Sequence, residues 1–333
     1  MKKKNRLSAQ EYIQGVLNGD RMVLSRAITL VESTLPSDQT LAEEVMGEVL
    51  PFSGKSIRIG VTGVPGVGKS TFIESFGKML VDQGHKLAVL AIDPSSQKSR
   101  GSILGDKTRM DSLAADKRAY IRPSPAGSKL GGVSARTREA MLLCEAAGHD
   151  VILIETVGVG QSEIAVKGMV DFFLLLMLSG AGDELQGIKK GIIEMCDALV
   201  INKADGGNLE AAKRAKRDYA NALHLFAVQE NGWSPKVEIC SGLSGQGLDA
   251  IWEMVQAYRE KMQSNGYFEF NRSNQRINWM HEHIMYLIEN KLYSNQHIQL
   301  LLGNILEKVK TGEVSPIAKA KELVDLFLEK KSS

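Results

Sequence analysis

The nine residues from 63 to 71 constrain the fold more than any other part of this chain: Gly63-Val64-Pro65-Gly66-Val67-Gly68-Lys69-Ser70-Thr71. They fit the pattern G-x-x-x-x-G-K-[ST], and they lie between a β-rich run at Ile57–Thr62 and an expected helix. Glycines at these positions let successive N–H groups point toward a phosphate, and the helix N-terminus adds its positive dipole. We expect Lys69 to reach the β- and γ-phosphates and Ser70 to place its hydroxyl on Mg²⁺. The loop therefore predicts a nucleoside triphosphate site in an α/β fold.

Short apolar runs alternate with helical segments from residue 56 onward. Continuous apolar strands of this kind are typical of a mostly parallel sheet that is covered on both faces. The sequence therefore predicts a three-layer α/β P-loop NTPase fold. The expected strands are Ile57–Thr62, Leu87–Ile92, Tyr120–Arg122, Val151–Glu155, Phe172–Leu178, Ala198–Asn202 and Val237–Cys240.

Both ends of the chain show helical rather than strand periodicity. At the C-terminal end, residues 276–292, 294–311 and 315–330 each predict a helix with an apolar face. We expect a helical N-terminal extension at 1–55, a P-loop domain at 56–265 and a helical C-terminal arm at 266–333. The apolar faces of the arm must pack on the core or on a second copy of the chain.

Composition excludes several classes of protein. With 41 Lys+Arg against 39 Asp+Glu, the chain has no basic excess that would indicate a nucleic-acid partner. Its three cysteines lie in apolar contexts, which fits reduced thiols. The N-terminus lacks the apolar core of a signal peptide, and the most apolar run, Phe172–Leu178, is too short to span a bilayer. We expect a cytoplasmic protein with no membrane partner.

The choice of base follows from an N-K-x-D signature at the end of one expected strand, formed by Asn202-Lys203-Ala204-Asp205. The Asp205 carboxylate can accept two hydrogen bonds from the guanine N1–H and 2-amino group, whereas adenine offers no such donor pair. Lys203 is expected along the base, and Asn202 is expected to hold neighbouring loops together. Ser241-Gly242-Leu243, after the next strand, resembles the GTPase loop whose amides contact the guanine carbonyl. Together these motifs favour GTP over ATP.

Acidic residues at two strand ends are the metal candidates. Glu155 ends an apolar strand and would hold a magnesium-bound water, while the Gly158 amide could contact the γ-phosphate. Asp93 at the end of another strand is the next candidate, and Asp106 is a further one. We therefore expect Lys69, Asp93, Glu155 and Gly158 to form the catalytic group.

The position after Gly158 predicts slow chemistry. Ras-like enzymes place a glutamine there to orient the attacking water, but this chain has Val159, and its nearest glutamine is Gln161. Valine cannot orient water by hydrogen bonding, so unassisted turnover should be at or below roughly 10⁻⁴ to 10⁻² s⁻¹. A stimulating partner or another group of the chain is then implied.

Several longer strings resemble the MeaB/ArgK family of P-loop GTPases over about residues 56–247: GVPGVGKST, AIDPSS, RGSILGDKTRM, ETVGVGQSE, GDELQGIKKGI and NKAD. The resemblance implies a GTPase chaperone of an adenosylcobalamin-dependent acyl-CoA mutase, usually methylmalonyl-CoA mutase. In that family GTP binding and hydrolysis gate cofactor loading and protect the mutase from inactivation. The positions that match the family's nucleotide and magnesium pattern are the P-loop residues, Asp93, Asp106, Glu155, Asp205 and Ser241–Leu243.

The resemblance also implies an extra switch loop at residues 180–191, where Asp183, Gln186 and Lys189 could sense the partner. It implies a homodimer formed through the C-terminal arm, and Mg²⁺ with GTP or GDP as the bound groups. Nothing in the residues indicates a cobalamin site on this chain.

Three alternatives stay open at this point. A nickel or cobalt metallochaperone GTPase shares the core, but it would be expected to carry clustered Cys or His, and here His281 and His283 point to different helix faces. An ATP-dependent kinase of an amino-acid transport component conflicts with the N-K-A-D sequence. A non-catalytic scaffold that holds nucleotide as structural glue has mild support from Val159.

Overall fold

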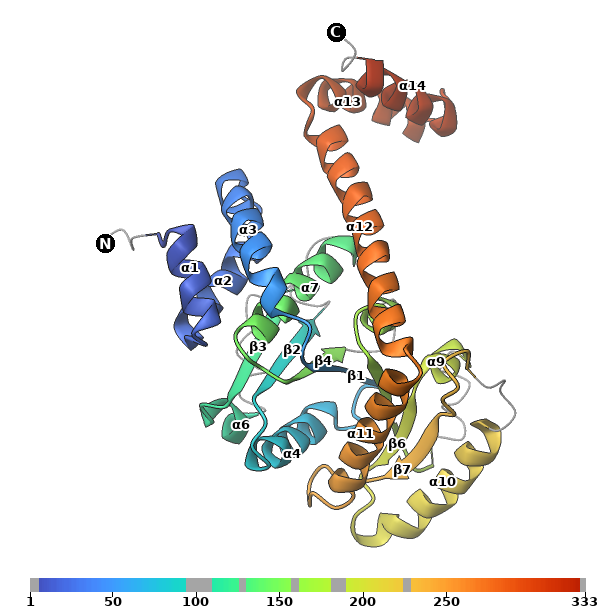
Figure 1. Cartoon of the computed structure of the whole chain (residues 1–333). Helices are drawn as coiled ribbons and strands as arrows, with labels where there is room; N and C mark the ends of the chain where they lie inside the picture. Colours follow the sequence, from blue (N-terminus) through green and yellow to red (C-terminus); the bar gives the residue numbers. More distant parts are fainter. Residues whose placement is uncertain are drawn as a thin grey trace. The chain divides into compact units, whose positions relative to one another are not determined.

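A computed structural model describes residues 6–93, 110–125, 130–156, 162–180, 190–223 and 229–329. Within these ranges, seven strands form one parallel sheet in the order β3-β2-β4-β1-β5-β6-β7 (Figure 1). The sequence expectation of a mostly parallel α/β sheet is confirmed. The strands are β1 Ile57–Gly63, β2 Leu87–Asp93, β3 Ala119–Pro125, β4 Val151–Thr156, β5 Phe172–Leu178, β6 Ala198–Asn202 and β7 Lys236–Ile239.

Successive side chains of each strand enter two separate hydrophobic layers. On β5, Phe173 and Leu175 join the layer on one face, and Leu174 and Leu176 join the layer on the other. Helices close both layers, so most positions of the central strands are apolar. This explains why the strands appear in the sequence as unbroken apolar runs rather than as alternating ones.

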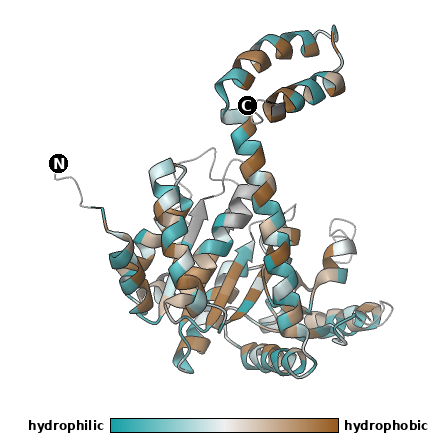
Figure 2. Cartoon of the chain, turned by 45° about the horizontal axis from the view of Figure 1, so that its top comes forward, coloured by the Kyte–Doolittle hydropathy of each residue, from teal (hydrophilic) through white to brown (hydrophobic). Residues whose placement is uncertain are grey.

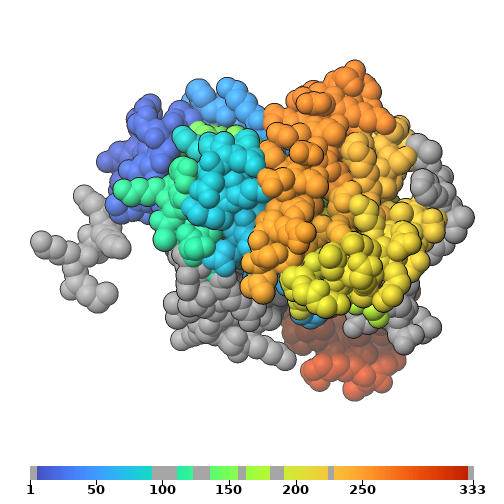
Figure 3. Space-filling view, turned by 90° about the horizontal axis from the view of Figure 1, so that it is seen from below, coloured from blue at the N-terminus to red at the C-terminus, as the bar shows by residue number. Residues whose placement is uncertain are grey.

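Two sets of helices cover the two faces. One layer contains the N-terminal helices and α7 to α10, and the other contains α4, α6, α11 and the start of α12. Figure 3 shows α4 and α11 side by side on the second face, where the Phe76 and Trp252 rings lie 6.3 Å apart, edge to face. The helices of the two layers are α4 Lys69–Asp82, α6 Asp111–Ala115, α7 Leu130–Ala146, α8 Ser162–Lys167, α9 Lys190–Met195, α10 Leu209–Leu223 and α11 Leu248–Ser264.

The N-terminal extension is helical, as expected, and packs on α7. Its elements are α1 Ala9–Leu17, α2 Arg21–Glu32, α3 Pro36–Val49 and the short 3₁₀ helix η1 Leu50–Phe52. Ser8 and Glu11 form a capping box at the start of α1, and the Asp20 side chain accepts two backbone N–H groups at the start of α2. These N-caps fix the residues at which α1 and α2 begin.

The C-terminal region differs from the expectation in one respect. Helix α12 runs over Tyr267–Ser294, so it begins directly after Gly266 rather than near residue 276. Its first turns are buried through Phe268, Arg272 and Gln275. The chain divides into two compact units, residues 1–275 and 276–333.

The second unit contains the rest of α12 with α13 Gln296–Lys310 and α14 Pro316–Glu329. These helices surround an apolar cavity of about 250 Å³. Figure 2 shows hydrophobic residues at intervals along these helices, and Met285, Leu300 and Ile317 are among the exposed apolar side chains. In the described part of the chain, no helix has the length and apolar character needed to cross a membrane.

Candidate nucleotide-binding site

The loop from Gly63 to Gly68 needs its glycines for backbone geometry. Gly66 and Gly68 have φ of +80° and +92°, in the left-handed region that glycine adopts without strain. A Cβ on Gly63 would lie 2.5 Å from the Leu176 carbonyl oxygen of the neighbouring strand. Helix α4 then begins at Lys69, so its unpaired N–H groups and positive dipole end lie directly at this loop.

Lys69 curls back over the loop that precedes it. Its Nζ donates to the Gly63 carbonyl at 2.7 Å and to the Val64 carbonyl at 3.3 Å. Burial lowers the pKa of Lys69, while the negative charges of Glu155 and Glu163 act in the opposite direction. A partly desolvated ammonium at the centre of the loop is a strong donor for an anionic ligand.

Ser70 and Glu155 bring two oxygen groups together beside the loop. The Ser70 Oγ donates to Glu155 Oε1 at 3.3 Å, and Glu155 is buried at the end of β4. The adjacent Thr156 donates to Thr62 at 2.8 Å and so joins the ends of β4 and β1. A hydroxyl beside a carboxylate is a donor set that suits a hard cation such as Mg²⁺.

Asn202 connects the phosphate loop with the loop after β7, as expected from the sequence. Its Nδ2 donates to the Val67 carbonyl at 2.9 Å, and its Oδ1 accepts from the Gly242 N–H at 2.9 Å. Asn202 is buried, so both bonds are shielded from water. The residue therefore holds two loops, more than 100 residues apart in sequence, in a fixed relation.

The neighbouring residues of the N-K-x-D loop face the same two segments. Lys203 has φ of +59°, the only positive value at a non-glycine position among the described residues, and its Nζ donates to the Gly66 carbonyl at 2.7 Å. One oxygen of the Asp205 carboxylate accepts from the Ser241 hydroxyl. The Leu243 side chain is 81% exposed beside this group. The site residues on β1, α4, β4, β6 and the loop after β7 thus come together at one edge of the sheet.

Ser75 is a site residue that the sequence analysis missed. It lies on α4 and donates to the Gly242 carbonyl at 2.5 Å. A Cβ on Gly242 would lie 3.0 Å from both N and Cα of Phe72, so the loop rests on the helix backbone. The only sequence signal was a polar residue within the apolar stretch of α4 that contains Phe72, Ile73 and Phe76.

Other predicted residues lie outside what the structure describes. Asp93 is the last residue of β2, but its side chain is outside the described set. The other predicted residues that lie outside the described ranges are Asp106, Gly158, Val159, Gln161, Asp183, Gln186 and Lys189. Their roles stay predictions.

Comparison with known proteins identifies the family to which this chain belongs. Residues 24–297 match the family described as "Methylmalonyl Co-A mutase-associated GTPase MeaB". The "GTPase ArgK" of Escherichia coli is 43% identical over 97% of this chain and 98% of its own length. The mouse "Methylmalonic aciduria type A homolog, mitochondrial" is 46% identical over 94% of this chain and 78% of its own length. A solved structure described as "LAO/AO transport system kinase" has a TM-score of 0.75 and 37% identity, with 98% of this chain and 99% of that one covered. The chain belongs to the MeaB family of P-loop GTPases.

Proposed function

We propose that this GTPase binds GTP across the two loops that Asn202 joins, with the phosphates at Gly63–Thr71 and the guanine at Asn202–Asp205 and Ser241–Leu243. The observation that carries the proposal is the pair of buried bonds from Asn202 to Val67 and Gly242. This frame sets the distance between a phosphate site and a base site, so that one nucleotide can occupy both.

The phosphate end stabilises negative charge. Lys69 donates to two neutral carbonyl groups, and phosphate oxygens with full negative charge are better acceptors. When the terminal phosphoryl group is transferred to water, Lys69 and the N–H groups at the start of α4 stabilise the charge on its oxygens. No protein group needs to form a covalent intermediate.

Ser70 and Glu155 fit the magnesium ion that accompanies the nucleotide in our proposal. Ser70 would bind it through its hydroxyl, and Glu155 would hold one of its water molecules. Bound there, Mg²⁺ neutralises charge on the phosphate oxygens. Asp93 and Asp106 are proposed as further groups of this site.

The base end selects guanine. Asp205 has one oxygen joined to Ser241, and its carboxylate would accept the two guanine donors. The Gly242 backbone, held by Asn202 and Ser75, would present the loop's amides to the guanine carbonyl. A purine without the donor pair would leave Asp205 unpaired, which disfavours ATP.

We further propose that the client is an adenosylcobalamin-dependent acyl-CoA mutase, most simply methylmalonyl-CoA mutase. The description of the matching family, mutase-associated GTPase, and the name of the mouse relative support this proposal. Nucleotide turnover would gate cofactor loading and protect the mutase from inactivation, with Asp183, Gln186 and Lys189 sensing the partner. The chain would act in the cytoplasm.

The proposed assembly is a homodimer through an arm at 266–333, attached to a GTPase domain at 56–265 and an extension at 1–55. Exposed apolar side chains on the outer faces of the second unit support this, because a second copy would bury them. They include Met280, Ile284 and Ile288 on α12 and Leu306 on α13.

The test is GTP hydrolysis by the full chain, alone and with methylmalonyl-CoA mutase, with ATP as the control nucleotide. We expect slow turnover alone, a clear rise with the mutase and none with ATP. No binding to the mutase would refute the client but leave the GTPase. The solved neighbour described as a kinase adds a second test, which measures phosphate transfer from ATP to a transport protein. Such transfer would favour kinase activity over GTP hydrolysis.

A further inference from the structure

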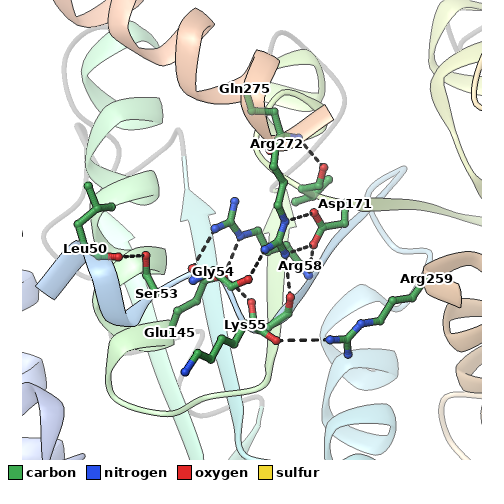
Figure 4. Close-up of polar contacts among 12 residues, drawn as sticks. Leu50, Ser53, Gly54, Lys55, Arg58, Glu145, Asp171, Arg259, Arg272 and Gln275 are labelled. Carbon is green, nitrogen blue, oxygen red and sulfur yellow. Dashed lines mark hydrogen bonds and ion pairs between the residues drawn. The ribbon is translucent and has the colours of Figure 1, made fainter. Parts of the chain in front are cut away.

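The start of α12 holds the short segment that follows α8. Arg272 binds the Asp171 carboxylate with two hydrogen bonds, from Nε to Oδ1 at 2.8 Å and from Nη2 to Oδ2 at 2.7 Å (Figure 4). One turn later, the Gln275 Nε2 donates to the Val170 carbonyl at 2.8 Å. All three side chains are buried. The contact is therefore a bidentate ion pair plus a shielded hydrogen bond, a geometry that fixes position closely.

The same arginine fixes this segment to the entrance of β1. Arg272 donates to the Gly54 carbonyl at 2.5 Å and to the Ser56 carbonyl at 2.7 Å. The Asp171 carboxylate also accepts the Arg58 backbone N–H at 2.8 Å. Gly54, Ser56 and Asp171 thus share one buried guanidinium, which leaves the segment after α8 little freedom.

Helix α8 itself rests directly on the β1 backbone. A Cβ on Gly60 would lie 2.8 Å from Val166 Cγ1 of α8 and 3.2 Å from Val170 Cγ2. Gly60 is on the strand that leads into the phosphate loop at Gly63. A shift of α8 along β1 is therefore blocked at one end by this contact and at the other by the Arg272 bonds.

Helix α8 follows β4 in the chain, and β4 runs parallel to β1, so the first turn of α8 lies at the edge of the sheet where β1 enters the phosphate loop. Glu163, in this turn, is fully buried. Burial lowers the pKa of Lys69, and the negative charges of Glu155 and Glu163 act in the opposite direction. The helix thus links a clamp at the N-terminal edge of the sheet to a carboxylate near the phosphate loop. Among the described residues, the hydrogen bonds of the Arg272 and Gln275 side chains all go to Gly54, Ser56, Val170 and Asp171, outside the loops proposed to bind nucleotide.

We propose that Arg272 and Gln275 are positioning residues for GTP hydrolysis, holding Val170 and Asp171 so that α8 stays fixed against β1, the strand that leads to the phosphate loop and Lys69. The inference rests on the proposed function, because it takes Lys69 to bind the terminal phosphates. It assigns the start of α12 a role in turnover, in addition to attaching the C-terminal helices.

The test uses two variants of the full chain, Arg272→Lys and Gln275→Leu. The lysine keeps the charge but loses the bidentate geometry, and the leucine removes only the bond to Val170. Arg259→Lys is the matched control, because Arg259 lies on α11 and donates to the Lys55 carbonyl at 3.5 Å without contacting residues 170–171. If Arg272→Lys fails to fold, Gln275→Leu alone decides the outcome.

We expect kcat for GTP to change by about fivefold or more in both variants, because small displacements of catalytic groups are costly. The Kd for GDP should stay within about twofold of the wild-type value. Hydrogen exchange of residues 162–171 should rise, and the control should match the wild type in all three measurements.

The inference would be overturned if kcat were unchanged in folded Gln275→Leu and in folded Arg272→Lys. That holds even if their melting temperatures fell, because the residues would then be structural only. GDP affinity that falls in parallel with kcat would overturn it as well. Absence of GTP hydrolysis by the unmodified chain would instead refute the proposed function, and this inference with it.

Discussion

Replacing Asn202 with alanine should weaken both the fold and the nucleotide site. The substitution removes the bonds to Val67 and Gly242, each 2.9 Å long and buried. A net hydrogen bond contributes about 1 kcal/mol, and a buried partner left unpaired costs about 1–3 kcal/mol. Because the two loops can relax in part, we expect the free energy of unfolding to fall by about 2–4 kcal/mol.

The same change should affect GDP binding. Without Asn202 the phosphate loop and the loop at Gly242 lose their direct hydrogen-bonded connection and keep the indirect contacts through Ser75 on α4 and through Lys203. Binding GDP then has to order the two loops, so we expect a loss of about tenfold or more in affinity, equivalent to about 1.4 kcal/mol.

The assay combines urea unfolding with calorimetric titration of GDP. Asn265→Ala is the matched control, because the Asn265 side chain donates to the Asn231 carbonyl at 3.0 Å and accepts the Tyr267 N–H at 3.0 Å away from the nucleotide loops. The control should lose about 1 kcal/mol of stability with unchanged GDP affinity. The reasoning would be refuted if Asn202→Ala stayed within about 0.5 kcal/mol of the wild type and bound GDP equally well.

Three further predictions concern single charged groups. Lys69→Ala should lower GTP turnover by about 100-fold or more, measured by phosphate release, and unchanged hydrolysis would contradict the assigned role. Asp205→Asn should weaken GTP by about 100-fold and favour xanthosine triphosphate, measured by competition; an intact GTP preference would remove Asp205 from the base site. Burial alone would raise the pKa of Glu145, but the bonds and charge of Arg58 outweigh it and hold the pKa below its ordinary 4.5. Its contribution to stability should be complete above pH 4.5 and lost as the pH falls through the lowered folded value. Glu145→Gln should therefore flatten the acid side of the urea-midpoint profile, and an unaltered profile would show that another group governs it.

Most of the sheet could be predicted because its strands are buried on both faces. A short apolar run such as Phe172–Leu178 is best explained as a strand buried on both faces of a parallel sheet. The strand-loop-helix context of Lys69 identifies the edge of the sheet where the phosphate loop lies. The N-terminal helices were predictable from the helical spacing of their apolar residues.

The start of α12 was not predictable in this way. Its first turns bury Arg272 and Gln275, whose polar side chains interrupt the apolar pattern that indicates a helix. Arg272 is stable in the interior because Asp171, Gly54 and Ser56 supply partners from distant parts of the chain, and Gln275 because Val170 does. The residues near 272 in the sequence do not indicate which distant residues will pair with them. Periodicity alone therefore placed the helix start nine residues too late, at 276 instead of 267.

The position of β1 in the sheet has a consequence for biosynthesis. The strand that leads into the phosphate loop pairs with β4 and β5, and both are translated long after it. While the ribosome has released only the first strands, β1 has no neighbour that can satisfy its backbone N–H and C=O groups. The nascent chain therefore has to keep an apolar strand without a partner until Val151–Thr156 emerges, and with one side unpaired until Phe172–Leu178 emerges. This interval is when aggregation competes most strongly with folding.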